Sequence, residues 1–152
     1  MKKFILILLF LFVCITQIQA YQIPDNLYKG LIAEDTSGDY KTYLAIASVV
    51  RNRLQKGMTP GLVALKRKDL DVFVAEQIAY VLKTKQINLE SQAKNAIREV
   101  LELNQDYSNG ATHYEHTKVY GIPSWAKSME IVKILYGGTE RQIIFYRERK
   151  ER

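Results

Sequence analysis

A run of apolar and small residues from Tyr43 to Val50 constrains the fold of this chain more than any other segment. No position in the run carries a charge, so a helix here would have no polar face to present to solvent. The helical pattern continues to Leu54, and two glycines and a proline between residues 57 and 61 then end it. The sequence therefore predicts a helix over Tyr43–Leu54 that is buried on most sides and around which the other segments pack.

Further helices are predicted on both sides of this segment. Asn26 is placed to cap a short helix that runs toward Glu34. Apolar residues at helical spacing predict a second long helix from Asp69 and a third from about Leu89. A fourth is predicted from Pro123 onward, carrying Trp125, Met129, Val132 and Tyr136 and ending at Gly137-Gly138.

Two short runs, Ala111–Glu115 and Ile143–Arg147, have the composition of strands. They predict a small antiparallel sheet, in which His113 shares a face with Glu115 and Thr112 shares the opposite face with Tyr114. The expected fold class is mainly α (α+β), a helical domain with a small antiparallel β element.

The first twenty residues are typical of a secretory signal peptide. Lys2 and Lys3 precede an apolar run that ends in a more polar stretch before Ala20. The run is shorter than the roughly 20 residues that cross a bilayer, so we expect cleavage and no stable membrane insertion, with a retained anchor as the alternative. The sequence thus predicts a signal peptide over residues 1–20, one domain over 21–152, and a location in the periplasm, the cell wall or the medium.

Composition narrows the classes of function. The only cysteine, Cys14, lies in the predicted signal, which excludes a disulfide scaffold and a cysteine nucleophile in the mature chain. The chain has 22 lysine and arginine residues against 16 aspartate and glutamate residues; without Lys2 and Lys3 the balance is 20 against 16, a net charge of +4. A mildly basic exported protein favours anionic wall polymers over nucleic acid, although solubility alone also explains the charge. We expect a monomer.

Glu34 is the acidic residue that stands out, because it lies just ahead of the apolar helix. A carboxyl held against apolar side chains has its neutral form favoured and can give a proton to a departing oxygen, as glycoside cleavage requires. The alternative is a surface acid or an ion-pair partner of Arg53.

Four segments carry a resemblance to a known family. Ile32-Ala33-Glu34, followed nineteen residues after Glu34 by Arg53, resembles the opening motif of the spore cortex-lytic cell-wall hydrolases. The segment Asp106–Tyr114 is similar to that family's Gly-Ala-x-His/Phe-Tyr segment, Pro123–Ala126 to its Pro-x-Trp, and Ile144–Tyr146 to its terminal Phe-Tyr. The four segments occur in the family's order and span essentially the whole mature chain.

The resemblance implies a lysozyme-like, mostly helical fold that acts on the glycan strands of peptidoglycan, with Glu34 as the catalytic glutamate. The chain departs from the family at several positions, with Asp35 after the glutamate and Gln142 in place of a histidine. These departures leave a catalytically degenerate wall-binding protein as an alternative. The residues expected to line a glycan-binding cleft are Tyr40, Asn52, His113, Tyr114, Glu115, Trp125 and Tyr146, each of which also has a structural explanation as a core or hydrogen-bonded side chain.

The expected chemistry is that of a lytic transglycosylase. Hydrolytic glycosidases use two carboxyl groups, whereas attack by the C6 hydroxyl of N-acetylmuramic acid on its own C1 needs one group that acts first as acid and then as base. Hydrolysis by a muramidase or glucosaminidase is the close alternative, with Asp35, Asp39 or Glu115 as the second carboxyl. A zinc site at His113 and His116 is disfavoured, because strand geometry points them to opposite faces, and no metal or cofactor is expected.

Overall fold

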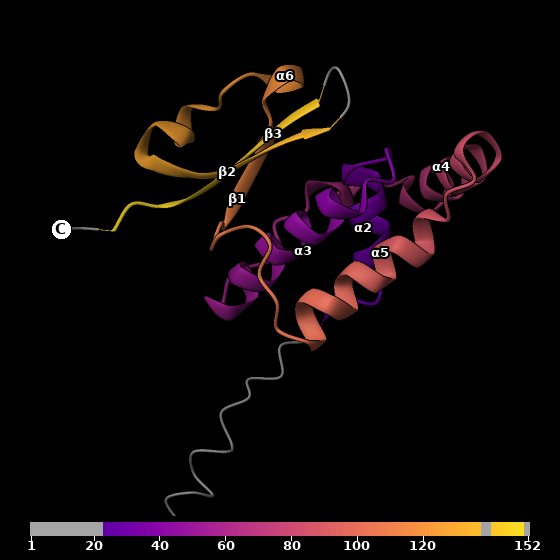
Figure 1. Cartoon of the computed structure of the whole chain (residues 1–152), viewed down its shortest axis with the longest axis horizontal. Helices are drawn as coiled ribbons and strands as arrows, with labels where there is room; N and C mark the ends of the chain where they lie inside the picture. Colours follow the sequence, from indigo (N-terminus) through magenta and orange to yellow (C-terminus); the bar gives the residue numbers. More distant parts are fainter. Residues whose placement is uncertain (1–22, 138–140, 151–152) are drawn as a thin grey trace, which may run out of the picture.

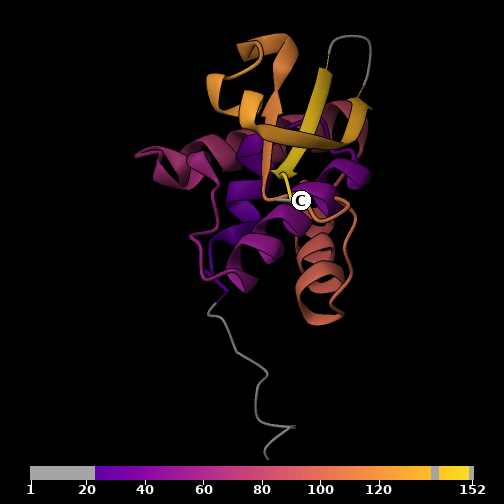
Figure 2. The same cartoon turned by 90° about the vertical axis from the view of Figure 1, so that its left-hand side faces the viewer.

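The computed structural model describes residues 23–137 and 141–150. Its helical part contains α2 (Leu27–Glu34), α3 (Tyr40–Gln55), the 3₁₀ turn η1 (Val63–Lys66), α4 (Leu70–Lys85) and α5 (Leu89–Ile97). A π-helical segment, η2 (Arg98–Glu102), continues α5. The β part contains β1 (His113–His116), α6 (Thr117–Tyr120), the 3₁₀ turn η3 (Ser124–Ser128), β2 (Met129–Gly137) and β3 (Arg141–Glu148). Figures 1 and 2 show the β part lying over one side of the helices.

Helix α3 is the central helix of the fold, as its sequence predicts. All nine residues from Thr42 to Val50 are buried. Its start is fixed by Asp39, whose carboxylate accepts hydrogen bonds from the Lys41 amide (3.2 Å) and the Thr42 hydroxyl (2.9 Å). The buried Ser48 hydroxyl donates to the Leu44 carbonyl (2.8 Å) and accepts from the Tyr107 amide (2.8 Å), so its polar group is satisfied.

The sheet is antiparallel with the order β1-β3-β2. Its central strand, β3, alternates between two apolar environments: Ile143 and Phe145 belong to the core formed with the helices, whereas Ile144 and Tyr146 pack with Ala126 and Met129 under η3. The predicted mainly α fold and the antiparallel pairing of the two predicted runs are confirmed, with Tyr114 of β1 opposite Phe145 of β3.

The fourth predicted helix is wrong. The segment after Pro123 forms only the short turn η3, and Met129–Gly137 is the strand β2. The register of β2 against β3 shifts between Ile131 and Lys133, which adds one residue at Val132. Because of this irregularity Val132 and Leu135 both pack against the helical core although they are three residues apart. A spacing that indicates one turn of helix thus arises here from an irregular strand.

The predicted signal peptide lies outside the described residues. Within the part of the chain that the structure describes, no helix is both long enough and apolar enough to span a membrane.

Candidate functional site

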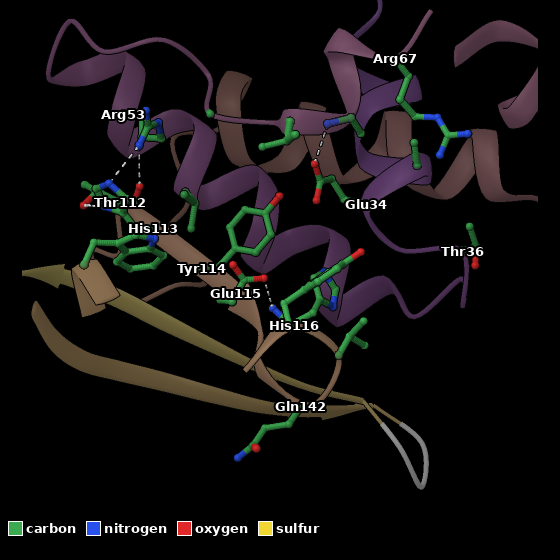
Figure 3. Close-up of a pocket in the computed structure, with 18 of the residues that line it drawn as sticks. Glu34, Thr36, Arg53, Arg67, Thr112, His113, Tyr114, Glu115, His116 and Gln142 are labelled. Atoms are coloured by element: carbon green, nitrogen blue, oxygen red, sulfur yellow. Dashed lines mark hydrogen bonds between the residues drawn. The ribbon is translucent and has the colours of Figure 1, made fainter. Parts of the chain in front are cut away.

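A pocket of about 890 Å³ lies where the helical part meets the β part. Its walls come from the end of α2, one face of α3, the segment around η1, β1 and α6 (Figure 3). Five of the predicted site residues line it, namely Glu34, His113, Tyr114, Glu115 and Trp125, together with Arg53.

Glu34 is the last residue of α2 and is half-buried in this pocket. Its Oε1 accepts a hydrogen bond of 3.0 Å from the backbone amide of Ala64, one of the amides at the start of η1 that has no partner within the turn. The side chain therefore caps η1 and is held in one orientation. Ala33, Val49 and Phe73 supply apolar parts of the same pocket.

The Tyr114 hydroxyl and the Glu34 carboxyl point toward one another (Figure 3). Burial raises the pKa of Tyr114 well above its usual range, and the charge of Glu34 and a hydrogen bond to it act in the same direction. Tyr114 therefore keeps its proton across the physiological pH range and acts as a hydrogen-bond donor beside Glu34.

Arg53 does not form the ion pair with Glu34 that the sequence left open. Its Nε donates to the Thr59 carbonyl (2.8 Å) and its Nη1 to the Thr112 carbonyl (3.1 Å), which orients the guanidinium toward β1. Gly61 has a φ of +81° and lies so close that a Cβ there would be 2.4 Å from Arg53 Nε. A glycine is therefore required at residue 61 both for its backbone conformation and for the position of Arg53.

His113 lies between Arg53 and Trp125. Its Nε2 is 3.4 Å from Arg53 Nη1 and its Nδ1 is 3.0 Å from the Thr112 hydroxyl. Since a guanidinium nitrogen only donates, Nε2 is the acceptor and the ring is neutral. Burial lowers the pKa of His113, and the charge of Arg53 lowers it further. The Trp125 ring packs against it with the centroids 5.3 Å apart.

Glu115 is the one of the three candidate second carboxyls that lines the pocket with Glu34. Its Oε1 accepts from the His116 amide (2.9 Å). Asp35 is buried outside the pocket, where it accepts from the Ser37 amide and hydroxyl, and Asp39 caps α3.

Three predicted glycan-binding residues lie outside the pocket. The Tyr40 hydroxyl donates to Glu99 (2.8 Å). The buried Asn52 amide donates to the Ser108 hydroxyl (3.1 Å) and the Ala111 carbonyl (2.9 Å). Tyr146 is buried beneath Trp125, with ring centroids 5.2 Å apart. The first two side chains are occupied by internal hydrogen bonds and the third is covered, so each holds the fold together.

Several residues of the pocket were not predicted from the sequence. Val63, Val119 and Tyr120 line it and are 74%, 65% and 76% exposed, an apolar border around a polar interior. Amphipathic rings such as that of Tyr120 are suited to the apolar faces of sugars. Gly121 ends α6 with a φ of +76°. A glycine at this position indicates the end of a helix, and it could have predicted a turn at which Val119 and Tyr120 are exposed.

No family model, curated protein or solved structure matches this chain. The resemblance to the cell-wall hydrolases therefore depends on its sequence motifs. Within the described ranges, no group of three or more His, Cys, Asp or Glu side chains is arranged to hold a metal ion.

We expect the protein to lose stability at alkaline pH. Burial and hydrogen bonding to Glu99 raise the pKa of Tyr40 to about 12, against about 10 in an unfolded chain. Between these values the unfolded chain releases the Tyr40 proton and the folded chain keeps it, so the free energy of unfolding falls as pH rises.

Urea midpoints measured at pH 8 and pH 11 test this expectation. The fall should be smaller in Tyr40→Phe than in the parent, while Tyr136→Phe, at a residue that is 73% exposed, should behave as the parent does. An equal fall in all three proteins would contradict it.

Proposed function

We propose that this protein cleaves the glycan strands of peptidoglycan as a lytic transglycosylase, with Glu34 as the general acid and base. The observation that carries the proposal is the placement of Glu34, oriented by the Ala64 amide at 3.0 Å in a large pocket with a partly apolar, aromatic border. The sequence resemblance points to the same glutamate. Export by the predicted signal would bring the protein to its polymer.

The reaction needs only one carboxyl group. Glu34 gives its proton to the glycosidic oxygen as the C1–O bond of N-acetylmuramic acid breaks. The C6 hydroxyl of the same sugar then attacks C1, and its proton returns to Glu34, which leaves a 1,6-anhydro ring and consumes no water. Tyr114, as a neutral donor beside Glu34, holds the carboxylate in position between the two proton transfers.

Product analysis tests the proposal. Purified sacculi are incubated with the protein, and the soluble fragments are analysed by mass spectrometry. We expect anhydromuramyl ends. Reducing ends would instead identify the protein as a hydrolase, either a muramidase or a glucosaminidase according to the terminal sugar. Binding to sacculi without any soluble product would make the protein a wall-binding one, and products cut in the peptide would refute a glycan-cleaving activity.

Glu115 favours hydrolysis as the second candidate function, because it brings another carboxyl into the same pocket. If Glu115 were the nucleophile or base of a hydrolase, Glu115→Gln would reduce cleavage by several orders of magnitude. For the transglycosylase we expect a reduction of about tenfold or less and unchanged anhydro ends, since the carboxylate only contributes to the local field. Rates of release from labelled sacculi, measured beside the parent, distinguish the two.

A further inference from the structure

The guanidinium of Arg53 is a positive charge in the pocket that has no negative partner in the part of the chain that the structure describes. The residue is half-buried, and its nitrogens contact the Thr59 and Thr112 carbonyls and the His113 ring. Among residues 23–137 and 141–150, no carboxylate lies within 4.0 Å of it. Withdrawing a charge from water is costly unless an opposite charge compensates it, so such a group is a candidate to receive an anion.

The second arginine of the pocket provides the contrast. Arg67 donates to both oxygens of Asp69, from Nε at 3.0 Å and from Nη2 at 2.8 Å, and its guanidinium lies 4.0 Å from the centroid of the Phe73 ring. Its charge is therefore already neutralised. Figure 3 shows the two arginines on opposite sides of Glu34, so the uncompensated charge occupies one side only.

The surroundings of Arg53 hold it in place. Two carbonyl acceptors orient it, and the missing side chain at Gly61 leaves it room. His113 accepts from it and is kept neutral, so it adds no competing charge on that side. Lys56, the residue that follows α3, is paired with Glu148 at 3.6 Å. A fixed guanidinium is the group that binds a carboxylate best, because both its donors and its charge are oriented in advance.

We propose that Arg53 forms a carboxylate-binding subsite at one end of the pocket, which holds an acidic group carried by the muramic acid of the glycan strand. This inference rests on the proposed function and adds to it a preference for glycan strands that carry a carboxylate. Two carboxylates fit the chemistry: that of the lactyl group on a peptide-free muramic residue, and those of a stem peptide attached to it. Chitin-like strands, which have neither, would lack this contact.

The single tryptophan of the chain supplies the reporter for a test. Trp125 lies against His113, which contacts Arg53, so occupation of this end of the pocket should change its fluorescence. Titrations use the full chain carrying Glu34→Gln, so that ligand is not consumed. The ligands are a peptide-free tetrasaccharide of alternating N-acetylglucosamine and N-acetylmuramic acid, the same molecule with its lactyl carboxyls converted to amides, and the same glycan bearing stem peptides.

We expect the peptide-free tetrasaccharide to bind on the order of tenfold more tightly than its amide, with the difference decreasing as salt is added. Tight binding of the peptide-bearing glycan as well would identify stem carboxylates as a second source of the anion. Arg53→Gln should remove the difference between acid and amide, and Arg53→Lys should keep part of it. Arg67→Gln is the matched control and should leave the ratio of the two affinities unchanged.

If the protein with an intact Arg53 bound the acid and amide forms of the tetrasaccharide equally well, the subsite would be overturned, although glycan binding itself would remain. This comparison needs no Arg53 variant, so it does not depend on whether such a variant folds. The subsite would also be overturned if folded Arg53→Gln still bound the acid more tightly than the amide, or if only Arg67→Gln lost that difference in affinity. A failure of every tetrasaccharide to bind would overturn it as well. The product analysis on sacculi is separate, so loss of the subsite and loss of the proposed function give different results.

Discussion

Glu34→Gln should reduce the release of glycan fragments from sacculi by roughly 10²- to 10⁴-fold, the range that a general acid or base contributes. Glutamine has the size of glutamate, and its amide oxygen can still accept the hydrogen bond that the Ala64 amide gives to Oε1. The capping of η1 is thus preserved. The group loses its ability to give and take a proton, and its amide nitrogen faces the Tyr114 hydroxyl, which must then accept a hydrogen bond where it donated one to the carboxylate. The initial rate of fragment release is the measurement.

Two controls separate chemistry from folding in this experiment. Glu90→Gln makes the same change on α5, in an exposed pair with Lys94, and should retain the parent's rate, since surface ion pairs contribute little. The thermal midpoint of Glu34→Gln should stay within a few degrees of the parent's. A folded Glu34→Gln protein that cleaves sacculi at the parent's rate would remove Glu34 from the mechanism.

Binding by the same variant bears on the degenerate alternative. A wall-binding protein without chemistry would release no fragments in either form and would bind sacculi equally well before and after the substitution. For the enzyme, we expect the variant to bind sacculi and fail to cut them. The combination of retained binding and lost cleavage distinguishes a catalytic carboxyl from one that only holds the pocket together.

The helices were predictable because their burial follows a period that the sequence displays. The segment Thr42–Val50 has no position that tolerates solvent. The caps were less predictable: Asn26 precedes α2 as expected but its side chain makes no capping hydrogen bond, whereas Asp39 and Asn88 cap α3 and α5. The strand β2 was not predictable in the same way. An extra residue at Val132 breaks the alternation of period two on which sequence patterns for strands depend, and only pairing with β3 reveals it.

The candidate site was predictable where residues close in sequence share a strand. His113, Tyr114 and Glu115 follow one another in β1 and all reach the pocket. The contact between Glu34 and the Ala64 amide joins segments thirty residues apart, and no local pattern indicates it. Tyr40 and Asn52 lie outside the pocket for the same reason, since their internal partners Glu99 and Ser108 come together with them only in the fold.

Asn52 is a buried polar side chain whose loss should cost much stability. Its amide nitrogen donates to the Ala111 carbonyl and the Ser108 hydroxyl in a loop that leads directly into β1, with Asp106 Oδ1 at 3.5 Å. Burial by itself raises the pKa of Asp106, but hydrogen bonds from Ser108, Gly110 and Asn52 outweigh it and hold the pKa below its usual value. The loop is thus built around a carboxylate, and the Asn52 amide joins it to α3 beside the hydrogen bonds that Ser48 and Arg53 make with its backbone.

Asn52→Ala should lower the free energy of unfolding by about 2–3 kcal/mol, because it leaves buried acceptors without a donor. Urea unfolding measures the change, with Gln55→Ala as the control: Gln55 lies on the same helix, is exposed and should cost less than about 0.5 kcal/mol. The same experiment decides the earlier hypothesis that Asn52 binds glycan. A variant with unchanged stability and weakened binding to sacculi would place Asn52 on the substrate. Lost stability, with binding retained by the fraction that stays folded, would confirm that Asn52 acts by holding the loop that carries His113 and Tyr114 into the pocket.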